Sequence, residues 1–322
     1  MALVQMKKVA LFLLSFVLAF VTVEIFLQYV IGFPTYGVEK KLIGIKSPSS
    51  GAQNIFKPYS SFFSVEGGLK IYKRNNLGFT GQDVDTLGNK KYIALLGNSY
   101  LQADQFSPEY TAAGILQQKL RNDSSGFEVL NLGVSGHDPL DLLYRVNYYS
   151  RTHKFEKVVL VIQDSQSAWL KRQSKIAFDR NLQVLHSNSL LTRILIPLRN
   201  NSVLIDLLAK IFNTKEEQED TIAKKENTSK PEASAYDEAY DLKLKSIFQE
   251  YYKIFGERFV VVNIASSEQV SIPEKALQYL KENGVKYKFK PINLPENKIS
   301  GKGHLNLQGN EKLGEVLYEV VR

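Results

Sequence analysis

The chain of 322 residues contains no cysteine. This excludes disulfide bonds, thiolate metal sites and cysteine nucleophiles, while it leaves the cellular compartment open. The sequence also lacks a glycine-rich dinucleotide-binding motif, a P-loop and a zinc-binding helix with paired histidines. We therefore expect neither a cofactor nor a metal ion, and any catalytic group has to come from the remaining polar side chains.

Arginine runs interleaved with aromatic residues are missing as well, although the net charge is +8. The lysines are scattered along the chain, which favours a solvated basic surface over a nucleic-acid groove. Nucleic acid is therefore not an expected partner. A basic surface would still favour anionic lipid or an anionic polymer.

One long hydrophobic run is present, close to the N-terminus. Residues 9–23 carry no charge, and the apolar character continues past Glu24 to about Ile31. About 20 such residues in a helix cross the hydrocarbon core of a bilayer, and Glu24 would then lie near one interface. A cleaved signal peptide is the alternative, but no small-x-small cleavage site follows the run. We predict an uncleaved membrane anchor over residues 1–32.

The rest of the chain divides into an irregular and a regular part. Residues 33–90 are rich in Gly, Pro, Ser and Tyr, and are expected to form a stalk and an irregular lead-in. Residues 91–322 alternate apolar strand patterns with amphipathic helix patterns, which predicts a parallel sheet with helices on both faces. Within this part, residues 214–233 are charged and nearly without large apolar groups, so a disordered insertion is expected there.

The periodicity also gives approximate bounds for each element. The expected strands cover residues 92–97, 127–133, 157–163, 258–266 and 285–292. The expected helices cover residues 110–120, 138–152, 236–256, 273–284 and 307–321. Asp138 and Pro139 suit the N-cap and first position of a helix, and Gly256 suits a helix end.

Polar residues follow three of the predicted strands. Ser99 comes just after the first strand, Gly136 and His137 follow the second, and Gln163 ends the third. His304 stands in the loop before the final helix. Because ligands bind beyond the carboxyl ends of parallel strands, we expect these residues to converge on one rim of the sheet.

These residue types suit acyl transfer. A serine hydroxyl needs an imidazole to take its proton, and the tetrahedral oxyanion needs hydrogen-bond donors aimed at it. Ser99 is the candidate nucleophile and His304 the candidate base, with the amides of Ser99 and Gly136 and the side chain of Gln163 as candidate donors. The Gly-x-Ser-x-Gly elbow of α/β-hydrolases is absent, because Leu101 occupies its last position. In the alternative interpretation, Ser99 and His304 are ordinary loop residues.

Four sequence blocks carry a family resemblance. They read LLGNSY, VLNLGVSGHDPLD, VVLVIQ and GHLNLQGNEKLGEVL, and in this order they resemble the four blocks of the SGNH (GDSL-type) hydrolase superfamily. The lead-in RNNLGFTGQD, residues 74–83, and the apolar anchor ending in a glutamate are similar to those of its membrane-anchored bacterial members. The resemblance covers the chain from about residue 9 to the end, with residues 165–235 unmatched.

The resemblance implies a flavodoxin-like three-layer α/β/α domain that hydrolyses or transfers an acyl ester, often on carbohydrate. By position, Ser99 matches the nucleophile, Gly136 the oxyanion glycine and His304 the catalytic histidine. Asn98 stands where the family usually has an aspartate, and together with His137 it is expected to line the binding site. The resemblance also implies a cytoplasmic N-terminus and an extracytoplasmic domain.

Two further positions depart from the family pattern. The third block usually supplies an asparagine, and here the candidates are Gln163 or, in a shifted register, Ser165. Gly301 stands where an acid normally precedes the histidine by three residues, which leaves Glu296 or Asp164 as carboxylates that could approach it. A Ser-His dyad can still act without the acid, because the acid mainly orients the imidazole.

The sequence thus predicts an O-acyl esterase or acyltransferase that acts on an envelope or exported polysaccharide through a serine acyl-enzyme. The departures from the family pattern support a second hypothesis, a catalytically inactive SGNH-fold protein that serves as a binding or scaffold protein at the cell envelope. In a third, the anchor assembles with membrane partners and the external domain docks them.

Overall fold

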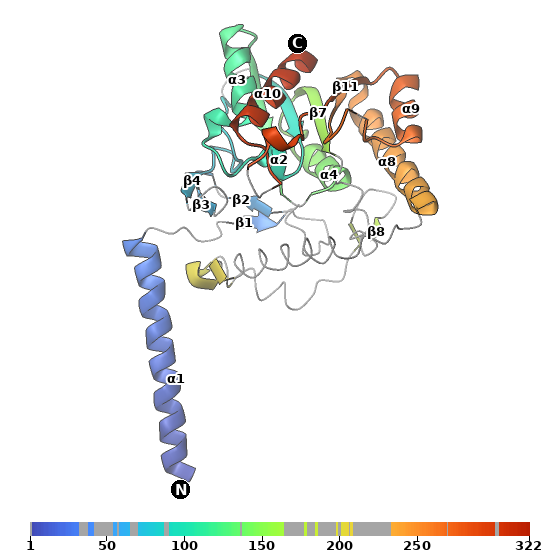
Figure 1. Ribbon diagram of the computed structural model, residues 1–322. Coiled ribbons are helices and arrows are strands. Elements are labelled where there is room, and N and C mark those ends of the chain that lie inside the picture. Colours follow the sequence, from blue (N-terminus) through green and yellow to red (C-terminus); the bar gives the residue numbers. More distant parts are fainter. Residues whose placement is uncertain are drawn as a thin grey trace.

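A five-stranded parallel sheet forms the centre of the domain (Figure 1), with strand order β11-β10-β7-β5-β6. Its strands are β5 (Lys91–Leu96), β6 (Phe127–Asn131), β7 (Phe155–Gln163), β10 (Phe259–Ile264) and β11 (Lys286–Lys290). Each lies where the apolar runs predicted a strand. The computed structural model describes residues 2–31, 38–41, 54–56, 58–64, 70–86, 90–135, 137–163, 177–178, 184–185, 198, 201–205, 207–208, 233–268, 270–299 and 303–322.

Helices cover both faces of this sheet, which confirms the predicted three-layer arrangement. One face carries α3 (Ala112–Asn122) and α10 (Leu307–Val321). The other carries α4 (Pro139–Tyr149), α8 (Ala233–Phe255) and α9 (Glu274–Glu282).

Strand β5 shows why its sequence is a continuous apolar run. Ile93 and Leu95 belong to the core beneath α3 and α10, whereas Ala94 and Leu96 belong to the core on the opposite face. Successive side chains of a strand point to opposite faces, so a strand buried on both sides needs an apolar residue at every position.

The helix ends follow the predicted signals. The carboxylate of Asp138 accepts bonds from the amides of Leu140 at 2.7 Å and Asp141 at 2.8 Å, and Pro139 occupies the first turn. Helix α8 ends at Phe255, and Gly256 follows with a φ of +56°, a conformation that costs a glycine little.

The segment before the domain is more regular than the sequence indicated. β1 (Val38–Lys41) pairs with β2 (Asn54–Phe56), and β3 (Ser61–Ser64) pairs with β4 (Lys70–Lys73), both antiparallel. Strands of three or four residues are too short to produce a periodic signal. A further short pair joins β8 (Ala177–Phe178) to β9 (Val184–Leu185). The predicted disordered insertion lies outside the described residues except for Ala233, where α8 begins.

The RNNLGF motif builds a loop that packs on the domain. The Asn75 side chain accepts bonds from the amides of Leu77 at 3.0 Å and Phe79 at 2.9 Å, and donates to the Gln82 carbonyl at 3.1 Å. The loop thereby places the Phe79 ring in the core, 4.9 Å from the ring of Tyr149. The packed unit therefore reaches back to the lead-in.

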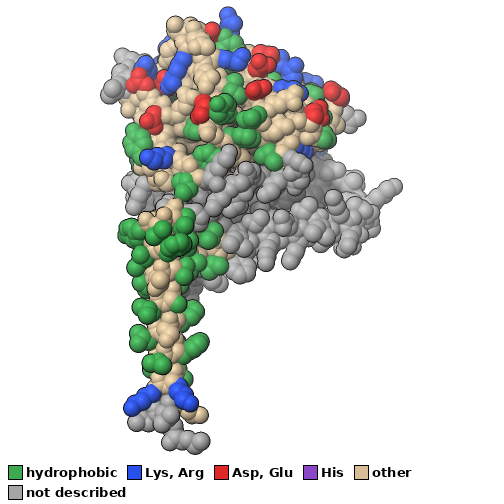
Figure 2. Space-filling view, turned by 60° about the vertical axis from the view of Figure 1, so that its left-hand side comes forward, with side chains coloured by type: hydrophobic (Ala, Val, Ile, Leu, Met, Phe, Trp, Pro, Cys, Tyr) green, Lys and Arg blue, Asp and Glu red, His purple; other side chains and the backbone are tan. Residues whose placement is uncertain are grey.

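The N-terminal segment forms one long helix that projects from the domain (Figure 1). It comprises α1 (Ala2–Ile25) and the π-helical turn η1 (Phe26–Val30). Among the described residues, Gln5–Val30 is the one helix long and apolar enough to cross a membrane. Hydrophobic side chains line its length, and basic side chains gather at its far end (Figure 2).

Replacing Asn75 by alanine should destabilise the domain. Two amides and one carbonyl of the loop would lose their partner, and each buried group left unsatisfied costs about 1–3 kcal/mol. Because water can reach some of these groups, the free energy of unfolding should fall by about 2–4 kcal/mol. Urea unfolding of the purified full-length protein measures this loss. The matched control is Asn122→Ala at an exposed position, expected within about 0.5 kcal/mol of wild type. Equal midpoints for both variants would contradict the assigned role of Asn75.

Candidate active site

Ser99 stands at the carboxyl end of β5, as the sequence predicted. It is the first residue of the short helix α2 (Ser99–Gln102) and is partly buried. The first amides of a helix have no acceptor within the helix. The Ser99 backbone N–H therefore points out of the helix start, where it can donate to a group held beside its own hydroxyl.

Asn98 forms the start of this turn. Its side-chain oxygen accepts a bond from the Tyr100 amide at 3.1 Å and so caps α2. The Asn98 Nδ2 group is buried and has no hydrogen-bond partner among the described residues. A buried donor in this state costs free energy and is suited to an acceptor that enters the site. Asparagine can act as the N-cap in place of the family's aspartate and adds this donor.

The loop after β6 is bound tightly to the Ser99 turn. The Val134 amide donates to the Gly97 carbonyl at 2.9 Å, and Asn131 Nδ2 donates to the Leu101 carbonyl at 2.9 Å. A Cβ at Gly133 would lie 2.9 Å from the backbone nitrogen of Gln102, too close for any larger residue. Glycine is thus required where the two loops meet. Gly136, the predicted oxyanion glycine, lies outside the described residues.

Tyr100 connects the Ser99 turn to the loop that carries His304. Its hydroxyl donates to Asn293 Oδ1 at 2.8 Å and contacts the Gly303 carbonyl, and its ring centroid lies 5.7 Å from that of His304. The structure therefore brings the predicted base against the residue that follows the predicted nucleophile. Tyr100 could not be identified as a site residue from the sequence, because local patterns give no sign of a partner so distant in the chain.

Two asparagines hold the His304 loop on the domain. Asn306 caps α10 by accepting a bond from the Gly309 amide at 2.9 Å, and its Nδ2 donates to the Glu296 carbonyl at 2.7 Å. The Asn306 amide donates to the carbonyl of the fully buried Asn297 at 2.8 Å. Within the loop, the Ile299 amide donates to the His304 carbonyl at 2.9 Å. The position of His304 is thus set by its backbone and by its neighbours.

Gln163 ends β7, the strand adjacent to β5, and is buried. Its placement at the same sheet edge agrees with the predicted convergence of strand ends. The other candidate donor, Ser165, lies outside the described residues. So do Gly301 and Asp164. Glu296 is exposed in the short 3₁₀ helix Pro295–Asn297, and its backbone carbonyl accepts the bond from Asn306.

His137 is buried, with an exposed fraction of 2%, and does not line an open surface. Neither ring nitrogen has a hydrogen-bond partner among the described residues. Burial, with a further contribution from the charge of Arg145, holds the pKa of His137 well below its ordinary value of 6.5. The imidazole is therefore neutral at physiological pH.

Two buried carboxyl groups lie at the start of α4, next to His137. Burial raises the pKa of Asp138, although its bonds to two backbone amides oppose the shift. The pKa of Asp141 is raised well above its ordinary value, first by burial and then by the neighbouring charge of Asp138. Lys243 on α8 favours the ionised form of both. This end of α4 is thus an enclosed polar cluster.

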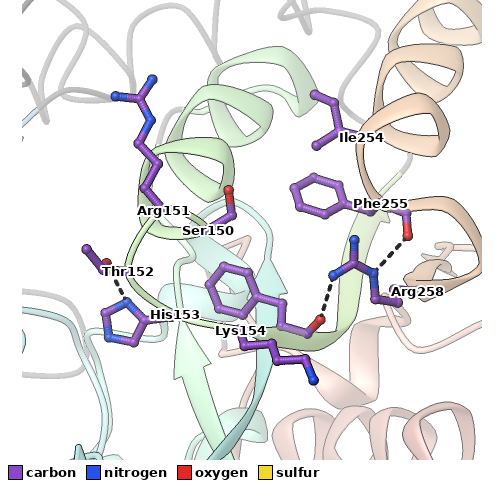
Figure 3. A pocket seen from close by; sticks show the side chains of 9 residues that line it. Ser150, Arg151, Thr152, His153, Lys154, Ile254, Phe255 and Arg258 are labelled. Carbon is purple, nitrogen blue, oxygen red and sulfur yellow. Dashed lines mark hydrogen bonds between the residues drawn. The ribbon is translucent and has the colours of Figure 1, made fainter.

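A pocket of about 440 Å³ lies at the opposite end of the sheet, where β7 begins (Figure 3). It is lined by residues 150–155 and by Ile254, Phe255 and Arg258. Arg258 donates to the carbonyls of Phe255 and Phe155, both at 3.1 Å, and Lys154 pairs with Glu156 at 3.4 Å. These cationic groups already have protein partners, and the pocket is remote from Ser99.

No protein-family model and no curated protein matches the chain. Solved structures similar to it include the esterase EstA from Pseudoalteromonas sp., with 9% identity, a TM-score of 0.43 and coverage of 71% of this chain and 96% of that chain. The lipase/acylhydrolase from Enterococcus faecalis has 13% identity, a TM-score of 0.41 and coverage of 71% and 94%. AlinE4, an SGNH-hydrolase family esterase, has 12% identity, a TM-score of 0.36 and coverage of 73% and 97%.

The first two of these neighbours are described as an esterase and a lipase/acylhydrolase, and AlinE4 is described as a member of the superfamily that the sequence motifs resemble. The identities and TM-scores are low, so the functional proposal rests on the residues of this chain. Those residues are Ser99 after β5, Gln163 at the end of β7, and His304 in the loop that Tyr100 joins to the turn after β5.

Tyr100→Phe should loosen the His304 loop. The variant keeps the buried ring but loses the hydroxyl that binds Asn293 and the Gly303 carbonyl, at a cost of about 1–3 kcal/mol. Hydrogen exchange should become faster at the amides of Ile299 and Asn306. Tyr110→Phe is the control, because Tyr110 is 56% exposed. Unchanged exchange in Tyr100→Phe would show that the hydroxyl does not hold the loop.

The buried His137 should make stability fall in mild acid. Below about pH 6.5 the unfolded chain binds a proton at His137 that the folded chain does not bind. The contribution of His137 to the free energy of unfolding is therefore complete above pH 6.5 and is lost as the pH falls below it. One such group gives a slope of about 1.4 kcal/mol per pH unit. Urea unfolding between about pH 5 and 7 should show this slope reduced in His137→Gln relative to wild type. Identical slopes would contradict the burial of a neutral imidazole.

Proposed function

We propose that this protein is an SGNH-type serine O-acyl esterase or acyltransferase. The observation that carries the proposal is the tie made by Tyr100 between the Ser99 turn and the His304 loop. It supports the pairing of a nucleophile with a base, the two groups that acyl transfer requires. In this role Asn98, which stands in place of the family's aspartate, supplies an amide donor. Gln163, which stands in place of the family's asparagine, supplies another.

The first half of the reaction forms an acyl-enzyme. Ser99 Oγ attacks the ester carbonyl carbon while His304 takes the hydroxyl proton, which leaves a tetrahedral oxyanion. The bond from carbon to the alcohol oxygen then breaks, and His304 returns the proton to that oxygen. The Ser99 amide, the Gly136 amide and Gln163 are the donors assigned to the oxyanion, because donors fixed in place before reaction stabilise the charge as it develops.

The second half regenerates the serine. Water or a sugar hydroxyl attacks the acyl carbon of the Ser99 ester and passes its proton to His304. The bond from carbon to Ser99 Oγ breaks, and His304 returns the proton to Oγ. Water gives hydrolysis, and a sugar hydroxyl gives transfer. The same residues serve both reactions, so access of the acceptor to the site decides between them.

We propose an acylated envelope or exported polysaccharide as the substrate, and a location at the cell envelope. In this assignment residues 1–32 anchor the chain, residues 33–90 form the stalk and lead-in, and residues 91–322 carry the site. The N-terminus is cytoplasmic and the domain extracytoplasmic. The long apolar helix supports the anchor. The orientation comes from the family resemblance, because Lys7 and Lys8 precede the apolar run while Lys40, Lys41 and Lys46 follow it.

A fluorophosphonate probe tests the chemistry, because it reacts with activated serine hydroxyls. Wild-type protein should be labelled, Ser99→Ala should lose the label, and His304→Gln should react at least about 100-fold more slowly, as expected when a general base is removed. The control is Ser246→Ala, which removes an exposed hydroxyl bound to the Leu242 carbonyl on α8 and should label as wild type does.

The same experiment decides against the alternative of an inactive binding or scaffold protein. That alternative is favoured by Asn98 and by Gly301, which replace two family carboxylates. It predicts no labelling of wild type, or equal labelling of wild type and Ser99→Ala, together with glycan binding that survives Ser99→Ala. Labelling that depends on Ser99 would reject it.

A further inference from the structure

The carboxylate of Glu24, near the end of the anchor helix, binds the start of a second helix. It accepts bonds from the amides of Val203 at 2.6 Å and Leu204 at 3.1 Å, and from the Ser202 hydroxyl at 2.9 Å. Ser202 Oγ in turn accepts the Ile205 amide at 3.1 Å. The first three amides of the second helix therefore all have an acceptor, and one of the two acceptors belongs to the anchor.

The anchor has one partly covered stripe that faces this contact. Between residues 5 and 31, the partly buried positions are Phe20, Glu24, Leu27 and Gln28. Residues spaced by three or four positions lie on one face of a helix. Gln28 also donates to the Glu24 carboxylate at 2.6 Å. The second helix thus docks on a defined face of the anchor, and Figure 1 shows it in yellow beside the upper end of α1.

The depth of Glu24 places this contact within reach of lipid. Lys8 and Glu24 are sixteen residues apart, a rise of about 24 Å in a helix, and the hydrocarbon core of a bilayer is about 30 Å thick. With Lys8 at one boundary, Glu24 lies just inside the other. A helix start at that depth cannot leave its amides to water and needs protein acceptors, and the bonds from Glu24 and Ser202 provide them.

The second helix carries apolar side chains, one of which is exposed. Residues 203–208 read VLIDLL, so five of the six are apolar and Asp206 is the exception. Leu208 is 43% exposed, whereas Val203 is fully buried. Such a segment exposed to water would be unfavourable, at roughly 25 cal/mol for each Å² of apolar surface. Acyl chains at the edge of the bilayer remove that cost.

We propose that the helix that starts at Val203 forms a second membrane contact, in which Val203–Ile205, Leu207 and Leu208 lie in the outer boundary of the lipid bilayer and Glu24 fixes the helix start to the anchor. The proposal rests on the membrane anchor assigned above and is independent of the acyl chemistry. It gives Glu24 a structural role and fixes the domain close to the membrane surface at two points. Cleavage after the apolar run would remove the carboxylate on which the helix start depends, which favours a retained anchor.

The absence of cysteine allows a direct test by single-cysteine labelling. An environment-sensitive fluorophore is placed on Leu208→Cys in full-length protein reconstituted in phosphatidylcholine vesicles. Phe16→Cys, 63% exposed in the middle of the anchor, is the inserted control, and Leu242→Cys, 47% exposed on α8, is the aqueous control. Quenching is measured with a nitroxide-bearing phosphatidylcholine and with iodide in the buffer.

The Leu208 label should be quenched by the nitroxide lipid, as the Phe16 label is, and protected from iodide relative to the Leu242 label. A Leu208 label that behaves as the Leu242 label does, while the Phe16 label stays lipid-quenched, would overturn the proposal and leave the anchor intact. A Leu208 label shielded from both quenchers would also overturn it, in favour of a protein partner. If the Phe16 label is not lipid-quenched, the anchor and the proposal fail together.

Glu24 is tested in the same vesicles. Glu24→Ala leaves two amides and a hydroxyl without their acceptor, so lipid quenching of the Leu208 label should fall to the level of the Leu242 control. Glu24→Gln keeps one acceptor oxygen and should retain part of the lipid quenching at Leu208. Val21→Ala, on the exposed side of the anchor, should have no effect. Unchanged quenching at Leu208 in Glu24→Ala, with Phe16 still inserted, would contradict the role assigned to Glu24.

Discussion

The hydroxyl of Tyr100 is the interaction on which the candidate site depends. It joins the turn after β5 to the loop before α10, two segments 193 residues apart at Tyr100 and Asn293. The sheet places Ser99 at its edge without help, because β5 ends there. The His304 loop follows β11, and its Asn293 amide donates to the Ala265 carbonyl just beyond β10 at 2.9 Å. The Tyr100 hydroxyl adds the side-chain contact that joins this loop to the turn after β5. A buried hydroxyl with polar partners is costly to break, which makes it suited to this task.

Polar residues without charge do most of the positioning around the site. Asn98 caps α2, Asn131 joins the β6 end to α2, and Asn306 caps α10. Each satisfies backbone groups at a point where a regular element begins or ends, and such groups cannot be left unpaired in a buried loop. Gly133 allows the loops to approach closely. The rim is therefore built largely by side-chain amides that satisfy backbone groups.

The sheet and its helices could be predicted from periodicity because both are long and repeat their pattern. The two-sided burial of β5, the cap at Asp138 and the end at Gly256 all follow from local rules. The antiparallel pairs in the lead-in were missed, since strands of three or four residues carry no pattern. Ser99 and His304 could be found as candidates because strand ends and family blocks mark them, and their roles remain proposals.

Two of the contacts that the sequence did not reveal join segments far apart in the chain. Tyr100 meets Asn293, and Glu24 meets Ser202, through bonds that no local spacing encodes. The burial of His137 was missed for the same reason, because a histidine in a polar loop gives no sign that α4 and its neighbours enclose it. Side-chain contacts between distant segments depend on the assembled fold, which local propensity does not specify.

The most direct measurement is a crystal structure of the protein after reaction with a phosphonate ester. The proposed function predicts phosphorus bonded to Ser99 Oγ, a phosphoryl oxygen that accepts a bond from the Ser99 amide, and His304 Nε2 within about 3.2 Å of the Ser99 oxygen or the leaving-group position. Ser99 that stays unmodified after prolonged reaction with excess reagent would contradict it. An adduct from which the His304 ring points away would contradict it as well.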